Sequence, residues 1–437
     1  MPYAFPGDLA DQIAARWHTF VARHDRPAPP LPPAAHLRHI LDTAFFASFV
    51  REEARDLRFV LCCAPGTEVP REGATETVPV VLFDAPRPLT VPALRALAPA
   101  VSPGNAAILV RCPADDVPVP ACEIAGLLNV GSNLARARSG RAFYHRPAPY
   151  ALVIDVRDAG ELHAYRGGIK LALLKSGSLH DQLAFSELEF LPISNILALG
   201  TAALDSRLRG SVEEPARETA DFAWTALLNT ILSVVSGIRE HGHGGTLLLV
   251  APGAEPTVPV RAKFDIHGPS TVLTERFAAF VNARNDLVGR QWAHRQTRAA
   301  AGEAVLPHLE NATYVAEEEL ADATDLVARL SAVDGALVIG SDLRVLGFGA
   351  EIVVDASRAV TAYDGSGPTR RVEDAAIVDG ESFGMRHRSA LRCVAVADGT
   401  AAFVVSQDGT VSFFWKHAGR VLVKRDVNIS NPNMAGM

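Results

Sequence analysis

Three basic residues in a row, Arg386-His387-Arg388, follow Gly384-Met385 and precede a mostly apolar run at residues 391–396. Two guanidinium groups can each bind a pair of phosphate oxygens, and an imidazolium adds a further donor. Cations at the edge of a buried core need an anion to face, and phosphate is the natural candidate. Gly384 would let the backbone approach such a ligand closely. The alternative, a solvated basic loop, is the usual role of an isolated Arg-x-Arg, but the apolar run that follows favours a phosphate site.

A phosphate site that catalyses a reaction also needs an acid–base group or a metal ligand, and Asp334 upstream of the basic triplet is a candidate. Asp334-Gly335-Ala336 leads into the strand candidate at residues 336–339. The carboxylate of Asp334 can hold a divalent metal ion or accept a proton from a ribose hydroxyl group. By itself an Asp-Gly pair usually forms a turn, because both residues tolerate positive φ. The pair therefore becomes a candidate site only in combination with the basic triplet.

The composition is that of a globular protein with a buried core, because 48% of the 437 residues are hydrophobic and 21% are charged. The formal net charge of -7 argues against an extended nucleic-acid surface, although a local basic pocket is compatible with it. The sequence shows no signal peptide and no apolar run of membrane-spanning length. Five cysteines without a Cys-x-x-Cys pair indicate buried free thiols in a reducing compartment. We therefore expect a cytoplasmic protein that does not contact a membrane.

The length predicts two or three domains. Residues 1–33 contain an amphipathic helix at 8–24 and a proline-rich connector at 26–33. Residues 34–215 are predicted to form a small α/β region with a β-meander. Its predicted elements are helices at 34–57 and 89–97, a helix or turn at 119–128, and strands at 58–63, 78–83, 106–111, 150–156, 162–166 and 169–174.

Residues 216–437 form the second predicted domain, after a polar, proline-containing boundary at 211–215. The apolar patterns indicate alternating long helices and short strands. The helix candidates are 217–240, 272–287, 291–304 and 316–330, and the strand candidates are 246–251, 336–339, 351–354, 393–396, 402–405 and 411–415. The chain as a whole is therefore predicted to be α/β (mixed α+β), with a C-terminal mixed β-sheet flanked by helices.

Four segments of this second domain resemble, in order, the motifs of the diadenylate cyclase (DAC) domain. That domain is the catalytic module of the DNA-integrity scanning protein and of membrane-bound cyclic di-AMP synthases. The segments are Gly244–Val250, Asp334–Ile339, Gly384–Ala390 and Val405–Ser412. Together they extend over roughly the last half of the chain, and their order makes the resemblance stronger than any single segment does.

The resemblance implies that two such domains meet face to face, each with one ATP, and condense the two ATP molecules into cyclic di-AMP. It implies that Asp334 acts on the ribose 3′-hydroxyl group and on Mg²⁺ or Mn²⁺, and that Arg386, His387 and Arg388 hold the triphosphate. Gly335 is expected to be part of the catalytic motif. The residues expected to contact ATP are Gly335, Ala336, Gly384, Arg386, His387, Arg388, Ser389 and Ser406.

Two residues depart from the family pattern. Met385 stands where a threonine usually precedes the basic triplet, and Gln407 stands where a glutamate is usual. Asp408 is the nearest carboxylate that could serve as a metal ligand instead, although it would face the other side of a regular strand. These departures favour a second hypothesis, a catalytically weak or inactive nucleotide-binding sensor with the DAC fold.

The N-terminal half resembles DACNV, a sensor region found before DAC domains. Residues 127–133 and the predicted meander at 150–174 carry this likeness, which names no ligand. A basic, aromatic run at 136–146 is interpreted as a solvated loop, with a nucleotide-sensing site as the alternative. His241 and His243 are interpreted as part of a glycine-rich helix terminator rather than as metal ligands.

Overall fold

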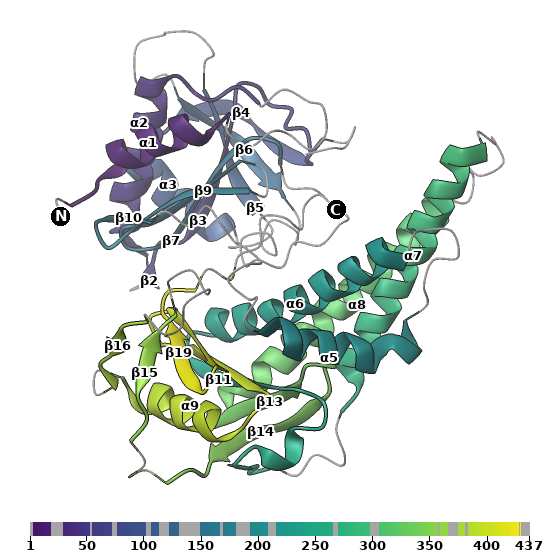
Figure 1. The fold of residues 1–437 in the computed structure, drawn as a ribbon. Coiled ribbons are helices and arrows are strands. Elements are labelled where there is room, and N and C mark those ends of the chain that lie inside the picture. Colours follow the sequence, from purple (N-terminus) through teal and green to yellow (C-terminus); the bar gives the residue numbers. More distant parts are fainter. Residues whose placement is uncertain are drawn as a thin grey trace. The chain divides into compact units, whose positions relative to one another are not determined.

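A computed structural model of the protein describes residues 3–18, 29–52, 55–71, 77–101, 106–112, 122–130, 149–166, 169–180, 193–208, 216–264, 270–297, 306–355, 357, 359–365, 375–380, 383–427 and 429. The chain forms two compact units, the first spanning Met1–Phe185 and the second Ser186–Ile429. Both units combine a large sheet with helices, which confirms the predicted α/β (mixed α+β) fold class (Figure 1). The basic run at 136–146 and the polar segment at 211–215 lie outside the described residues.

The first unit is built on an eight-stranded sheet with the strand order β10-β9-β8-β7-β3-β5-β6-β4. A separate two-stranded ladder joins β1 (Arg51–Glu52) and β2 (Arg55–Asp56). The strands of the large sheet are β3 (Phe59–Ala64), β4 (Val80–Pro88), β5 (Ala106–Arg111), β6 (Glu123–Asn129), β7 (Leu152–Asp158), β8 (Glu161–Arg166), β9 (Ile169–Lys175) and β10 (Ser178–His180). The helices are α1 (Pro6–Arg16), α2 (Ala34–Ser48) and α3 (Val91–Leu97).

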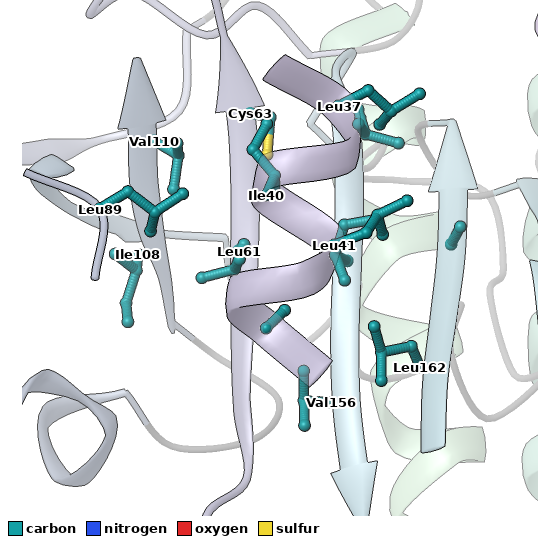
Figure 2. Packing of buried hydrophobic residues seen from close by; sticks show 14 of the residues in the cluster. Leu37, Ile40, Leu41, Leu61, Cys63, Leu89, Ile108, Val110, Val156 and Leu162 are labelled. Carbon is teal, nitrogen blue, oxygen red and sulfur yellow. The ribbon is translucent and has the colours of Figure 1, made fainter. Parts of the chain in front are cut away.

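Helix α2 packs on this sheet through one apolar stripe. Leu37, Ile40 and Leu41 have the i, i+3, i+4 spacing of a single helix face and are fully buried. They belong to one core cluster with Leu61 of β3 and Val156 of β7 (Figure 2). Burial of each such side chain stabilises the fold by about 1.5–3 kcal/mol. The sheet and its helices thus share one hydrophobic core.

Three predicted elements of the first unit are wrong, and the β-meander is confirmed. Helix α1 ends at Arg16, whereas the prediction extended it to residue 24. Helix α2 ends at Ser48, whereas the prediction extended it to residue 57; the charged residues beyond it form the β1–β2 ladder instead. The helix or turn predicted at 119–128 is strand β6, which pairs with both β4 and β5. Gly126 explains the tight pairing, because a Cβ atom there would come within 2.3 Å of the Val81 carbonyl oxygen.

The second unit is built on a nine-stranded mixed sheet with the order β12-β14-β13-β11-β17-β18-β19-β15-β16. Its strands are β11 (Gly245–Val250), β12 (Val260–Arg261), β13 (Ala336–Gly340), β14 (Val345–Ile352), β15 (Ala362–Asp364), β16 (Ile377–Val378), β17 (Thr400–Val405), β18 (Val411–His417) and β19 (Arg420–Lys424). Its helices are α5 (Ser194–Leu204), α6 (Ala216–Glu240), α7 (Val272–Thr297), α8 (Leu306–Arg329) and α9 (Met385–Val396).

Strand β11 lies inside this sheet, parallel to β13 and antiparallel to β17. All its residues are buried, as expected for a continuous apolar strand with both faces covered. One face packs against α9, whose Leu391 and Val394 share a core cluster with Leu248 and Val250. The opposite face meets α6, since a Cβ atom on Gly245 would come within 2.8 Å of Ile238. The sheet is therefore sandwiched between α9 and the α6 side (Figure 1).

Helix α6 contains an apolar window, Phe222–Glu240, that is long enough by length and composition to cross a membrane. The expectation that no apolar run reaches this length is therefore wrong. However, 89% of the window is buried, and α6 contacts α5, α7 and α8. This burial is typical of the core helix of a folded domain.

The boundary between the units falls earlier than the predicted one after residue 215. Helix α5 groups with the second unit because it packs against α6. The Ser341 hydroxyl donates a 2.8 Å hydrogen bond to the Ile196 carbonyl, and Gly200 leaves no room for a side chain against the Ser341 backbone. These contacts tie residues of α5 to the end of β13.

Candidate functional site

One edge of the nine-stranded sheet collects the predicted site residues. Strands β11 and β13 both begin there, because Thr246 pairs with Ala336 in a parallel ladder. Strand β17 ends there, because its last residue, Val405, pairs with Gly245. Strand β18 begins and β19 ends at the same edge, as the β17–β18 and β18–β19 registers require. Residues far apart in sequence therefore meet along a single edge.

The basic triplet lies in the first turn of α9, whose N-cap residue is Gly384. The predicted strand at 393–396 is therefore wrong. The buried residues Ala390, Leu391 and Val394 have helical spacing, and they direct one side of α9 onto the sheet. The first backbone N–H groups of a helix have no partner within the helix, and the helix dipole makes this end positive. The guanidinium groups of Arg386 and Arg388 add to that positive charge, so the turn is suited to a bound anion.

Arg386 connects this turn to the chain that enters β11. Its guanidinium donates a hydrogen bond to the His243 carbonyl oxygen at 3.3 Å. Gly244 has a φ of 65° and leaves room for the Arg386 side chain because it has no Cβ atom. An added Cβ atom would lie 3.0 Å from the Arg386 guanidinium and 3.3 Å from the Gln407 backbone nitrogen. The glycine thus brings Arg386 next to the β17–β18 turn, which contains Ser406. The two predicted ATP contacts Arg386 and Ser406 lie in the same part of the sheet edge.

His387 occupies a different environment from Arg386, because it lies on the buried side of α9. Its ring stacks on Phe383 at 5.7 Å and meets Phe414 edge-on at 6.0 Å. Its Nε2 atom lies 3.2 Å from the Ser412 hydroxyl. Burial, followed by the positive charge of Arg425, holds the pKa of His387 below its ordinary value, while Asp408 opposes this shift. The imidazole is therefore neutral at neutral pH when no anion is bound.

We expect the pKa of His387 to respond in opposite directions to two substitutions. Arg425→Gln removes a repelling charge and raises the pKa, whereas Asp408→Asn removes an attracting charge and lowers it further. NMR titration of the imidazole resonances measures both. Because the folded-state pKa is depressed, the stability associated with His387 is complete above the unfolded value of about 6.5 and is lost as the pH falls below it. Equal titration curves in both variants and the wild type would contradict this electrostatic account.

Arg388, Ser389 and Gly384 complete the first turns of α9. Arg388 and Ser389 are half-buried, and the Arg388 N–H closes the first helical hydrogen bond to the Gly384 carbonyl at 3.1 Å. Apart from the chain neighbours of Gly384, no atom of the described residues lies within 4 Å of the place that a Cβ atom on Gly384 would take. That Gly384 lets a ligand come close to the backbone stays a prediction.

Asp334 lies at the same sheet edge, immediately before β13, and β11 separates it from β17. Its side chain is 92% exposed, with a carboxylate oxygen 3.6 Å from the Lys263 ammonium group. Lys263 also donates a 2.9 Å hydrogen bond to the Asp334 carbonyl oxygen. Asp334 is thus an accessible carboxylate at a defined backbone position, and Ala336 behind it is buried in the sheet.

Gly335 holds Asp334 in place through a backbone conformation that favours glycine. Its φ is 133°, and an added Cβ atom would lie 2.3 Å from the Gly349 carbonyl carbon in β14. We expect Gly335→Ala to lower the free energy of unfolding by about 1–3 kcal/mol from backbone strain alone, with displacement of β14 in addition. Urea unfolding measures the loss. The matched control is Gly347→Ala in β14, where the added Cβ atom would make only an ordinary 3.6 Å contact. A loss of stability as large in that variant would contradict the explanation.

The acidic residues at this edge fit a metal ion that is held mainly by a substrate. Mg²⁺ in nucleotide sites usually takes one or two protein carboxylates together with phosphate oxygens and water. Asp334 is one such exposed carboxylate. Asp408 accepts a 2.9 Å hydrogen bond from the Thr410 N–H within its own turn, so its role as a ligand stays a prediction. Among the residues that the structure describes, no group of three or more His, Cys, Asp or Glu side chains is arranged for a metal ion. His241 and His243 directly follow α6, which ends at Glu240.

Arg425, which follows β19, is a cation of this edge that sequence reasoning missed. Its guanidinium lies 4.7 Å from the centre of the Phe383 ring, and its charge acts on His387. No strand was predicted at 420–424, so the sequence did not indicate that Arg425 lies at this edge of the sheet. The apolar run Val421-Leu422-Val423 is the signal that could have identified the strand and placed Arg425 at its end.

The family model described as "Probable sensor domain DACNV" matches residues 26–128, within the first unit. The predicted N-terminal sensor region is therefore supported. Of the segments that carried the predicted likeness, 127–133 and 150–174, only residues 127 and 128 fall inside the match. No curated protein matches the chain. Residues 26–128 are thus similar to a probable sensor domain.

Proposed function

We propose that the second unit binds ATP and condenses two ATP molecules into cyclic di-AMP, under the control of the N-terminal sensor region. The observation that carries this proposal is the meeting of the basic first turn of α9 and the accessible carboxylate of Asp334 at one sheet edge. The DACNV match supports it independently, because the name of that family connects it with DAC domains. The cofactor would be Mg²⁺ or Mn²⁺.

The triphosphate would be bound by the N-terminus of α9. The backbone N–H groups of its first turn and the guanidinium groups of Arg386 and Arg388 supply donors to phosphate oxygens. Arg425 adds positive charge beside them. A bound triphosphate would raise the pKa of His387, because it places negative charge near an imidazole that is neutral without it. Ser389 and Ser406 would provide hydroxyl contacts.

Asp334 would act on the ribose 3′-hydroxyl group. It would accept the hydroxyl proton, or hold the metal ion that lowers the charge of the phosphates. The 3′-oxygen forms a bond to the α-phosphorus of the other ATP, the bond to the β-phosphate breaks, and pyrophosphate leaves. The second half of the reaction repeats these changes in the opposite direction and closes the ring. Positioning and charge neutralisation provide the catalysis in such transfers.

One site holds only one of the two ATP molecules. The reaction therefore requires two copies of the second unit facing each other, with each 3′-hydroxyl group directed at the partner's α-phosphate. A twofold pair satisfies this requirement, because both sites are then equivalent. We accordingly propose a homo-oligomer with face-to-face DAC units as the active form.

A second candidate function is nucleotide sensing without turnover. Met385 is the first residue of α9 and is 79% exposed, at the position where the DAC family usually has a threonine. A thioether cannot donate a hydrogen bond to a phosphate. Gln407 stands where the DAC family usually has a glutamate, so it also favours nucleotide sensing without turnover. Both residues would leave nucleotide binding intact while they weaken the reaction.

Thermal unfolding with and without ATP and Mg²⁺ tests the shared part of both candidates, because a ligand that binds the folded state raises the unfolding temperature. We expect ATP to raise it. The variant Met385→Thr separates the candidates: increased product formation shows that the methionine limits an active enzyme. Binding of ATP without product, in the wild type and in this variant, would favour the sensor.

A further inference from the structure

Two cysteines of the first unit face each other in its sheet. Cys112 directly follows β5, and Cys122 directly precedes β6. Arg111 pairs with Glu123 at the end of this antiparallel ladder, so Cys112 and Cys122 are the next opposed residues. Both lie within the segment that matches the sensor-domain family. The pair therefore belongs to the predicted sensing part of the chain, whereas the residues of the proposed nucleotide site belong to the second unit.

The two sulfur atoms are close enough to bond after a small movement. Their Sγ atoms lie 3.1 Å apart, whereas a disulfide has an S–S distance of about 2.05 Å. Opposed residues in antiparallel strands have Cα atoms about 4.5–5.5 Å apart, within the range of about 4.4–6.8 Å that a disulfide allows. The Cys112 N–H donates to the Ala64 carbonyl and the Cys122 carbonyl accepts from the Leu89 N–H, which fixes both backbones. The sulfur atoms need to approach by only about 1 Å to reach bonding distance.

The hydrogen bond between the two thiols shifts their pKa values in opposite directions. This hydrogen bond lowers the pKa of Cys122. The same hydrogen bond, burial and the nearby Cys63 raise the pKa of Cys112. A thiolate is the reactive form of cysteine towards oxidants. Whichever of the two sulfur atoms reacts first with an oxidant, the other lies 3.1 Å away and is placed to resolve the product.

We propose that Cys112 and Cys122 form a reversible dithiol–disulfide site in the sensor region, with hydrogen peroxide as the oxidant. The thiolate of one cysteine attacks a peroxide oxygen, the O–O bond breaks, and the leaving hydroxide takes up a proton, which yields a sulfenic acid and water. The sulfur of the other cysteine then attacks the sulfenic acid sulfur, the S–O bond breaks, and the hydroxyl group leaves as water with the proton of the attacking thiol. Two thiols and one peroxide give one disulfide and two waters. A thiol reductant such as dithiothreitol restores the pair by exchange.

Burial selects a small oxidant. Cys112 is 2% exposed and Cys122 is 1% exposed, within the core cluster beneath α2. The neighbouring pair Arg111 and Glu123 is roughly half exposed and joined by a 2.6 Å ion pair, so the surface is only one residue away on each strand. Hydrogen peroxide is small enough to reach the buried sulfur atoms from this surface, whereas a disulfide-containing peptide is too large.

The test treats the full-length, reduced protein with hydrogen peroxide and maps the cysteines by mass spectrometry of a non-reducing digest. We expect a peptide pair linked through Cys112 and Cys122, lighter by two hydrogen atoms than the separate peptides and lost on addition of dithiothreitol. Cys112→Ala and Cys122→Ala should each abolish the link. Cys62→Ala, on the opposite face of β3, and Cys393→Ala, in the second unit, should leave it unchanged.

The map of the wild-type protein alone is decisive, so the result does not depend on whether every variant folds. Three results would each overturn the proposal. Other cysteines could be linked, the link could join two chains, or Cys112 and Cys122 could stay reduced while methionines are oxidised. Loss of the link in Cys62→Ala would overturn it as well, unless that variant has lost the wild-type circular dichroism spectrum, in which case the wild-type map decides. The outcome is independent of ATP binding and turnover, so it stands or falls apart from the proposed cyclase function.

Discussion

Replacing both Arg386 and Arg388 by alanine should weaken ATP binding by about 100-fold or more, while the protein stays folded. Each guanidinium offers charge-assisted hydrogen bonds worth about 1.5–3 kcal/mol, and about 1.4 kcal/mol corresponds to a factor of ten in Kd. Neither side chain is part of the core of α9, which is formed by Ala390, Leu391, Cys393 and Val394. Isothermal titration with ATP and Mg²⁺ measures the change. Arg386→Ala and Arg388→Ala, each by itself, should weaken ATP binding by about tenfold or more.

The control for this prediction is Arg392→Ala, which removes the same charge from the same helix farther from its N-terminus. If that variant loses as much affinity, the effect comes from net charge and not from a site at the first turn. Arg386→Lys and Arg388→Lys provide a further distinction, because lysine keeps the charge but loses the paired donors. We expect these two variants to fall between the wild type and the alanine variants.

Asp334→Asn should lower the rate of product formation by about 100-fold to 10,000-fold, the usual contribution of a positioned acid–base group. Asparagine keeps the size of the side chain but neither accepts a proton nor holds a metal ion well. The carboxylate is exposed and its contact with Lys263 is at the surface, so we expect little change in stability. Steady-state product formation from ATP, together with the ATP Kd, measures the effect. Unlike the arginine variants, Asp334→Asn should retain most of its ATP affinity.

The matched control is Asp398→Asn, another exposed carboxylate, which precedes β17 at its opposite end and pairs with Lys416. We expect wild-type turnover from it. Full activity in Asp334→Asn would show that the carboxylate has no part in the reaction. Equal losses in both variants would point to a general charge effect.

The sequence predicted the central elements of the second unit because their patterns are long and unambiguous. Helix α6 and strands β11 and β13 lie where the apolar periodicity indicates. Residues 393–396 were mistaken for a strand because four apolar residues in a row fit either state; the earlier residues His387 and Ala390 were needed to recognise a helical stripe. Strand β6 was missed for the related reason that its pairing with β4 and β5 is not local.

The motifs predicted which residues form the candidate site, but only the sheet register shows how these residues are arranged. Asp334 and Arg386 are far apart in sequence and meet at one edge because β11 pairs with β13 on one side and with β17 on the other. The role of Gly244 depends on the position of the Arg386 side chain, which no local pattern contains. Arg425 enters the site through the β18–β19 pairing. These relations come from long-range contacts, so sequence spacing cannot provide them.

The most direct test of the proposed function is to incubate the purified full-length protein with ATP and either Mg²⁺ or Mn²⁺ and to separate the products by liquid chromatography with mass detection. We predict a product with the mass and retention of cyclic di-AMP, together with two pyrophosphates for each molecule formed. The same product should be missing from Asp334→Asn. If ATP binds but neither metal supports any cyclic product, the cyclase function is contradicted and the nucleotide sensor takes its place.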